Sequence, residues 1–291
     1  MAPQTFIDSQ HQAFFDEQGF IVLDVLEQNQ LEALKLLFQE TYFANNNPRS
    51  NFNAVSDKER NNLIRLESIR ILAPSFNKVF KNYINNGATF FLKQPSQGEL
   101  GLHQDSTMVD FSEDFACYAW TPLQDVNEHN GCMFIIPKSH LFFKNYNSFT
   151  YRNTEIYLKE VVPDAIKKIE MKAGEILFYD NRLFHGSFAN QSSELRIAMN
   201  MLIVSDKAKL RYYQKKNDFF TSEYHATAES FLNSHDVYAK GLLPEGAEFI
   251  RDIPYTHHFV TAKDINKANK QFDVNSKPLK KWWRQVLTKY F

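Results

Sequence analysis

Apolar and polar positions near the N-terminus predict a helix, a strand and a second helix. Asp8 and Ser9 can cap a short helix, and Gly19 is placed to end it. The run 20–25 is compact and rich in β-forming residues, which indicates a strand. Over 28–43, leucine and phenylalanine recur at helical spacing, so we expect an amphipathic helix that covers one face of a sheet.

Between residues 88 and 204 the pattern changes to short β-like runs separated by Gly, Asn, Asp and Pro. These runs cover 88–92, 115–123, 132–136, 174–179 and 196–204. Many short strands with turn signals predict a sandwich or barrel, here mainly β with flanking α-helices. No repeat or low-complexity linker interrupts the sequence, so we expect a single domain over 1–291 with its β core at about 88–204.

The C-terminal third gives a weaker pattern. Residues 206–260 are rich in Tyr, Phe and His without a clean period, and they predict no particular element. The tail 277–291 carries basic but no acidic residues, and its aromatic and aliphatic residues recur at helical spacing. A terminal helix docked by its aromatic face is the favoured interpretation, with a membrane-surface or partner-binding helix as the alternative.

Composition narrows the class of protein. The hydrophobic content of 43% is ample for a core, and the net charge of -1 gives no indication of nucleic acid or an anionic membrane as partner. Two cysteines, Cys117 and Cys132, are too few for a disulfide framework, so we expect both to be reduced and buried. Without a signal pattern or an apolar run long enough for a transmembrane segment, the sequence predicts a soluble cytoplasmic protein.

The first candidate for chemistry is His103-Gln104-Asp105. On a strand, positions i and i+2 point to the same face, so both side chains could bind one ion. An imidazole and a carboxylate without a thiolate suit Fe(II), Mn(II) or Zn(II). Taken alone the spacing is weak, because a His and an Asp two residues apart are usually a surface pair.

A second candidate segment lies later in the chain. A turn at Gly174 and an apolar strand lead to His185, which would be delivered at the edge of the β core. Arg196 then places a permanent cation in an apolar strand, so it needs a bound anion or a carboxylate neighbour. Glu194 and Asp180 are the candidates for a structural ion pair. A second His distant from a His-x-Asp pair completes a 2-His-1-carboxylate set.

Together these segments resemble the phytanoyl-CoA dioxygenase-like family of Fe(II)/2-oxoglutarate-dependent oxygenases. The similarity runs from the helix–strand pattern at 14–25 to about residue 204 and leaves the C-terminal part uncovered. Its most specific blocks are His103-Gln104-Asp105, 119–133, 136–140, and His185-Gly186-Ser187 with Arg196. One departure is Lys138, where the family usually has glycine, so the local turn could differ.

The resemblance implies a double-stranded β-helix (jelly-roll, cupin-like) core and a dioxygenase using Fe(II), 2-oxoglutarate and O2. Such an enzyme hydroxylates an unactivated C–H bond of a small or medium organic molecule and releases succinate and CO2. By the resemblance, the catalytic metal ligands are His103, Asp105 and His185. Arg196 would pair with the distal carboxylate of 2-oxoglutarate, Ser187 would donate a hydrogen bond beside it, and Trp120 would line that pocket. Lys93 and the neighbouring Phe90 are further candidate contacts.

Several alternatives stay open. The rival class is a cupin-like metal-binding isomerase or a non-catalytic binding protein that keeps the ligands. His140 is interpreted as a turn residue or a support for the ligands, and His129 as part of a polar turn. The loops 44–57, 140–158 and 205–224 are candidates for substrate binding. They do not identify the substrate, whether it is carrier-linked, or whether hydroxylation gives way to desaturation or cyclisation, and the sequence leaves the oligomeric state open.

Overall fold

The computed structural model describes residues 4–42, 58–143, 146–148, 156–227, 242–243 and 246–275. Its helices are α1 (Ser9–Gln18), α2 (Gln28–Tyr42), α3 (Lys58–Val79), α4 (Ser139–Phe142) and α7 (Ala262–Asn275), with 3-10 turns at Leu158–Glu160 and Pro163–Ala165. Its strands are β1 (Phe20–Asp24), β2 (Tyr83–Lys93), β3 (Leu100–His103), β4 (Ala116–Pro122), β5 (Met133–Ile135), β6 (Lys167–Ile169), β7 (Glu175–Asp180), β8 (His185–Ser187), β9 (Arg196–Ser205), β10 (Arg211–Asn217), β11 (Phe220–His225) and β12 (Glu248–Pro254).

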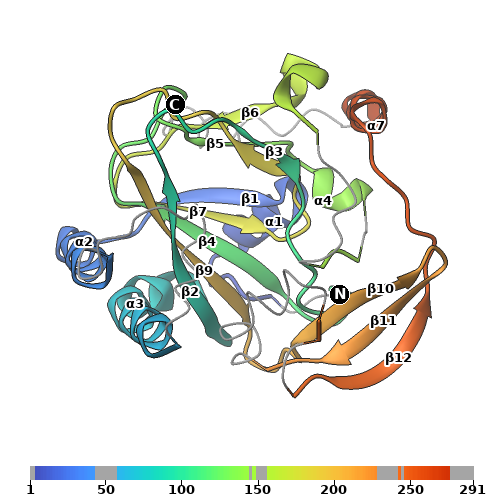
Figure 1. The fold of residues 1–291 in the computed structure, drawn as a ribbon, viewed down its shortest axis with the longest axis horizontal. Coiled ribbons are helices and arrows are strands. Elements are labelled where there is room, and N and C mark those ends of the chain that lie inside the picture. Colours follow the sequence, from blue (N-terminus) through green and yellow to red (C-terminus); the bar gives the residue numbers. More distant parts are fainter. Residues whose placement is uncertain are drawn as a thin grey trace.

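Two antiparallel sheets form the β core (Figure 1). The larger sheet has the order β1-β7-β4-β9-β2 and the smaller one has the order β3-β8-β5-β6. Their facing sides share one cluster of buried residues, in which Leu102 and Phe134 of the smaller sheet pack with Trp120 and Leu177 of the larger. The prediction of a mainly β jelly-roll core is therefore confirmed.

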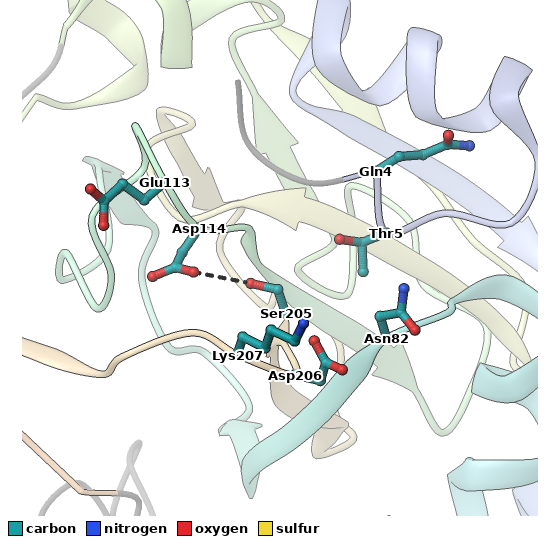
Figure 2. A pocket seen from close by; sticks show the side chains of 8 residues that line it. All are labelled: Gln4, Thr5, Asn82, Glu113, Asp114, Ser205, Asp206 and Lys207. Atoms are coloured by element: carbon teal, nitrogen blue, oxygen red, sulfur yellow. Dashed lines mark hydrogen bonds between the residues drawn. The ribbon is translucent and has the colours of Figure 1, made fainter.

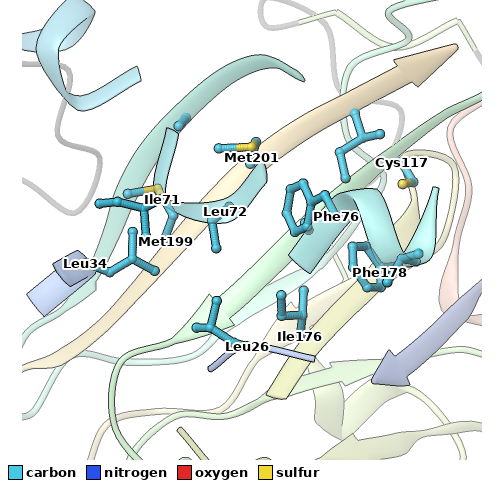
Figure 3. Packing of buried hydrophobic residues seen from close by; sticks show 14 of the residues in the cluster. Leu26, Leu34, Ile71, Leu72, Phe76, Cys117, Ile176, Phe178, Met199 and Met201 are labelled. Carbon is cyan, nitrogen blue, oxygen red and sulfur yellow. The ribbon is translucent and has the colours of Figure 1, made fainter. Parts of the chain in front are cut away.

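The other side of the larger sheet, here called the outer face, packs against α1, α2 and α3 (Figures 1 and 3). Apolar residues alternate along its strands, as the two-residue period of a strand requires. Phe178 of β7 lies with its ring centroid 5.0 Å from Phe80 and 5.8 Å from Phe76. Figure 3 shows Phe76 with Met201 of β9 on one side and Phe178 on the other, in one cluster that also includes Met199. Much of the abundant phenylalanine thus fills the space between helices and sheet.

The N-terminal elements and the five predicted core strands are present with small changes at their ends. Strands β3, β6 and β8 lie outside the predicted runs. Helix α3 was not predicted either, and it contains Pro74. Lys138, in place of the family's glycine, keeps the left-handed backbone (φ 66) that glycine would favour. Its amide donates a hydrogen bond to the Gln18 carbonyl oxygen and its amine lies 3.1 Å from Glu17, which holds the turn against α1.

A third antiparallel sheet, β10-β11-β12, follows the β core (Figure 1). Its centre is Glu223, whose buried carboxylate accepts hydrogen bonds from the side chains of Arg211 (3.0 Å) and Arg251 (2.7 Å). The sheet joins the core where the Arg211 amide donates to the Met108 carbonyl oxygen at 2.8 Å. Its three strands lie within 206–260, the region for which the sequence predicted no element.

Three remaining expectations concern the cysteines, the tail and the membrane. Cys117 lies in β4 and Cys132 just before β5, and both are buried free thiols, as expected. The predicted helix in the tail 277–291 falls outside the described residues. Among the helices that the structure describes, none is long and apolar enough to span a bilayer.

Candidate metal centre and anion site

The two predicted histidine ligands face each other across neighbouring strands of the smaller sheet. His103 ends β3, His185 begins β8, and the two residues are paired in the β3–β8 register. The Nδ1 atoms of His103 and His185 lie 2.9 Å from the carbonyl oxygens of Gly101 and Leu183 respectively. Because a carbonyl oxygen can only accept, Nδ1 carries the proton in each ring, and the Nε2 lone pair is available to a metal.

Asp105 completes the cluster, although not as the sequence analysis expected. It does not lie on the strand with His103, because β3 ends at His103. The chain turns after the strand, and the Asp105 amide donates to the Asn181 carbonyl oxygen at 2.9 Å. This turn places the Asp105 carboxylate 3.5 Å from His185 Nε2 and 3.9 Å from His103 Nε2.

These three residues fit a metal ion. One ligand atom from each of His103, Asp105 and His185 lies within 4.8 Å of the others, so all three could contact one cation. Two imidazole nitrogens and one carboxylate oxygen on one side form the 2-His-1-carboxylate pattern, which suits Fe(II) and leaves the opposite positions open. The two rings are buried, whereas the Asp105 side chain is 24% exposed.

Gly186 separates His185 from Ser187 because the space beside it is full. A Cβ atom there would clash with the Leu100 carbonyl oxygen and would lie 2.6 Å from the Phe134 ring. Any side chain would push β3 and β5 away from β8 and would displace His185 from its partner. The glycine of the His-Gly-Ser motif is thus needed for the close approach of three strands.

Arg196 is buried at the start of β9, and the described residues offer it no carboxylate partner. Asp180, one candidate for a structural ion pair, is bound by Arg182 instead at 2.6 Å. Within the described ranges no carboxylate lies within ion-pair distance of Arg196, and its Nε atom has no hydrogen-bond partner. Burial lowers the pKa of Arg196 to about 10, so it stays charged at neutral pH. A buried guanidinium that is charged and has no carboxylate neighbour among the described residues favours the binding of an anionic ligand.

Lys93 adds a second buried basic group beside the first. It is the β2 residue paired with Arg196 in β9, and its amine donates to Ser187 Oγ at 2.8 Å. Burial, and then the charge of Arg196, lower the pKa of Lys93 to about 7. Gly131 closes over the Lys93 chain, since a Cβ atom there would lie 2.8 Å from Lys93 Cδ. This looser candidate of the sequence analysis therefore lies with Arg196 and Ser187.

Trp120 packs between Arg196 and Lys93, here called the basic pair, and the apolar core between the sheets. Its ring centroid lies 5.4 Å from Arg196 Cζ. Phe90, the other loose candidate, does not join this group, because it points to the outer face and packs 5.2 Å from Phe38. Its neighbour Phe91 lies on the inner side and offers its carbonyl oxygen to Arg196 Nη1 at 3.5 Å.

Other predicted residues fall in several places. His140 is buried in α4, where its Nε2 lies 3.1 Å from the Asp16 carbonyl oxygen of α1, and its role as a support for the ligands stays a prediction. His129 is an exposed turn residue, as interpreted. Sequence reasoning missed Tyr179, whose hydroxyl donates to Asp105 Oδ2 at 3.2 Å. Its position beside Asp105 depends on the placement of β7 in the sheet, which no motif signals. The candidate substrate loop 44–57 lies outside the described residues, as do 144–145 and 149–155 of the loop 140–158. The third candidate, 205–224, contains β10 and most of β11.

A separate polar pocket of about 360 Å³ lies at the far end of β9 (Figure 2). Ser205 and Asp114 line it and are joined by a hydrogen bond of 3.4 Å. Ser205 is nine residues from Arg196 along an extended strand, a span of about 30 Å. This pocket is therefore distinct from the metal cluster and the basic pair.

The fold and the cluster define the class: a jelly-roll protein with a 2-His-1-carboxylate candidate metal centre between its sheets. The family model described as Phytanoyl-CoA dioxygenase (PhyH) matches residues 15–198, more than half of the chain. The chain belongs to this family.

Similar curated proteins carry the same family name. "Phytanoyl-CoA dioxygenase" of Arabidopsis thaliana is 33% identical over 128 residues, which cover 41% of this chain and 44% of that protein. "Phytanoyl-CoA dioxygenase 1" of Oryza sativa subsp. japonica is 29% identical over 143 residues, which cover 44% and 48%. The chain thus spans less than half the length of these relatives.

Solved structures share the fold at low identity. The non-haem alpha-ketoglutarate-dependent carbocyclase SnoK from nogalamycin biosynthesis matches with a TM-score of 0.51 and 20% identity, over 70% of this chain and 86% of that chain. The epimerase SnoN, solved with Fe3+, alpha-ketoglutarate and nogalamycin RO, matches with a TM-score of 0.51 and 18% identity, over 69% and 85%. These similarities support the jelly-roll assignment.

Proposed function

We propose that this chain is an Fe(II)- and 2-oxoglutarate-dependent oxygenase that hydroxylates an unactivated C–H bond of a small or medium organic molecule. One observation carries the proposal. His185 of the candidate metal cluster and Ser187, which binds the Lys93 amine, are two residues apart on β8, about 7 Å along the strand. A short dicarboxylate with a metal-chelating 2-oxo acid end can bridge such a distance.

The basic pair would hold the distal carboxylate of the cosubstrate. Arg196 offers a planar fork of donors with an unused Nε, which suits a carboxylate. Lys93 would add an ammonium donor, while Ser187 Oγ links its amine to β8. Trp120 would lie against the carbon chain and exclude water from the ion pair, which strengthens it.

The metal cluster would bind the other end. His103, Asp105 and His185 would occupy one side of the ion, and the 2-oxo acid would take two of the remaining positions. When bound, the metal supplies O2 activation coupled to conversion of 2-oxoglutarate to succinate and CO2. Related halogenases lack the carboxylate ligand, so Asp105 favours hydroxylation over halogenation.

The substrate remains defined only as a small or medium organic molecule. The relatives named for phytanoyl-CoA match less than half of their length, and SnoK and SnoN, which are a carbocyclase and an epimerase, share only the fold. We also propose that β10–β12 belongs to the same oxygenase domain, because the Arg211–Met108 hydrogen bond joins it to the loop after Asp105.

The test is an anaerobic titration of the Fe(II)-loaded protein with 2-oxoglutarate, followed by the visible metal-to-ligand charge-transfer band. We expect the band to appear with the wild type and to require much more 2-oxoglutarate with Arg196→Met. Arg70→Met is the matched control, because Arg70 is an exposed residue paired with Glu67. A folded, iron-loaded protein without the band would instead support the cupin-like isomerase or binding protein.

A further inference from the structure

Tyr179 contacts two of the three candidate ligands from a strand that supplies neither. It lies in β7, and its hydroxyl donates to Asp105 Oδ2 at 3.2 Å. Its ring centroid is 4.8 Å from that of His185. The Tyr179 side chain is almost fully buried, so the larger sheet holds it rigidly against the metal cluster.

Among the three candidate ligands, Asp105 has the side chain that is least restrained by the backbone. Both histidines are oriented by backbone carbonyl oxygens, but Asp105 lies beyond the end of β3 and its side chain is partly exposed. Over the described residues, Tyr179 is the side chain that donates a hydrogen bond to this carboxylate. Without that donor, the carboxylate could rotate away from the two Nε2 atoms.

Asn200 makes a second contact to the phenol of Tyr179. It lies in β9, and its side-chain amide hydrogen-bonds to Tyr179. Asn200 is also the β9 residue paired with Trp120 in β4. The contacts Asn200–Tyr179–Asp105 therefore connect β9, beside Trp120, with the candidate metal cluster.

We propose that Tyr179 is a positioning residue of the metal centre, which fixes the Asp105 carboxylate in its metal-binding orientation through its hydroxyl group. This inference rests on the proposed metal site. Packing alone does not require the hydroxyl, since a phenylalanine would fill the same volume against His185. A hydrogen bond to a ligating carboxylate adds to metal affinity by keeping the ligand in place before the ion arrives.

The test compares Fe(II) affinity of wild type and Tyr179→Phe, by competition with a chromophoric chelator under anaerobic conditions. We expect about 10- to 100-fold weaker binding, the range found when a ligand loses its supporting partner. The d–d spectrum of the Co(II)-substituted protein should change as well, because the carboxylate geometry changes. Tyr118→Phe is the matched control: Tyr118 faces Tyr179 across β4–β7 at a ring distance of 5.6 Å but makes no hydrogen bond to Asp105.

Two further measurements exclude a general structural effect. In an Asp105→Ala background, Tyr179→Phe should change Fe(II) affinity no further, because its partner is gone. Asn200→Ala, which keeps the phenol but removes the amide behind it, should weaken Fe(II) binding by a smaller factor. This variant also serves as the test should Tyr179→Phe fail to fold, in which case unchanged Fe(II) affinity in Asn200→Ala overturns the inference.

The outcomes separate this inference from the proposed function. A wild type that binds no Fe(II) or Co(II) would contradict the metal site itself. A wild type that binds the metal, together with a Tyr179→Phe variant of equal affinity and equal Co(II) spectrum, would overturn the positioning role alone. An equal loss of affinity in Tyr118→Phe would also overturn it, since the effect would then not depend on the hydrogen bond.

Discussion

The two faces of the larger sheet use the same strands for different purposes. Along β9, Met199, Met201 and Ile203 point to the outer face and are fully buried against the helices. Arg196 and Asn200 alternate with them and point between the sheets. On the outer face the side chains of β9 are apolar, whereas on the inner face buried polar and charged side chains stand among the apolar ones.

The difference separates folding from chemistry. Apolar burial on the outer face stabilises the fold by about 25 cal/mol per Å² of surface. Burying a charge or an amide on the inner face destabilises it unless a partner is present. Arg196 and Lys93 therefore indicate function because folding alone gives no reason for them. Removal of Phe178 from the outer face and of the Arg196 charge from the inner face should therefore change stability in opposite directions.

The largest effect on stability is expected on the outer face. Phe178→Ala removes a fully buried ring that contacts Phe76 and Phe80, and should lower the free energy of unfolding by about 3–5 kcal/mol. Urea denaturation measures the loss. The folded fraction should keep wild-type Fe(II) affinity, and a large drop in that affinity would show that the faces are not separable.

On the inner face, Arg196→Met should weaken binding of 2-oxoglutarate without lowering the stability of the fold. Loss of the guanidinium should weaken 2-oxoglutarate binding by about 2–5 kcal/mol, as for other buried charge pairs. Without 2-oxoglutarate, however, the variant should be at least as stable as wild type, because an unpaired buried charge is replaced by an apolar chain of similar size. Calorimetric titration and urea denaturation test the two halves, and a strongly destabilised variant would mean that Arg196 has a structural partner.

Lys93 makes cosubstrate binding depend on pH. With a pKa of about 7 in the folded protein, its amine is largely neutral above pH 7, and an incoming carboxylate would raise that pKa. Binding should therefore take up a proton, and affinity for 2-oxoglutarate should fall by up to about tenfold per pH unit above 7. Titrations in buffers of different ionisation enthalpy detect the proton. A Lys93→Met variant should show weaker binding without this slope.

The same residue sets a slope in stability without cosubstrate. The unfolded chain has the ordinary lysine pKa of 10.5, so between pH 7 and 10.5 it binds a proton that the folded protein does not. Stability from this group should rise with pH across that window and be constant below it. Urea denaturation at several pH values should show the slope in wild type and its loss in Lys93→Met, with Lys78→Met, at an exposed ion pair, as control.

The smallest expected effect concerns one polar atom on the outer face. Thr121 is fully buried, and its hydroxyl has no hydrogen-bond partner in the described part of the chain. Thr121→Val keeps the shape and removes the unpaired hydroxyl, so stability should rise by about 1 kcal/mol. Thermal unfolding measures the change. A decrease in stability would reveal a hydrogen-bond partner for the hydroxyl.

The sequence predicted those parts of the molecule that depend on local pattern. The helix at 28–42 follows from leucine spacing, and the core strands β2, β4, β5, β7 and β9 follow from β-rich runs between turn residues, whereas β3, β6 and β8 lie outside those runs. Helix α3 escaped because Pro74 and many exposed polar residues blur its periodicity. The third sheet escaped because it is organised around the buried ion pairs of Glu223, which follow no two-residue apolar alternation.

For the candidate site, the sequence predicted which residues take part, but it did not predict how the strands that carry them are paired. The ligand set was named from its motif, yet only the structure pairs His103 with His185 and moves Asp105 off the strand. Lys93 could be only a loose candidate, because its approach to Arg196 depends on how β2 and β9 align. The donor role of Tyr179 has the same origin, since it depends on where β7 places the ring.

The orientation of the two histidines has a consequence for how such a site can change over evolution. Each ring is held by the carbonyl oxygen of the residue two positions before it, that is, by its own segment of backbone. Substitution of a neighbouring side chain leaves these two contacts intact. The lining around the metal can therefore vary, and substrate preference with it, while the direction of two of the three ligands is inherited unchanged.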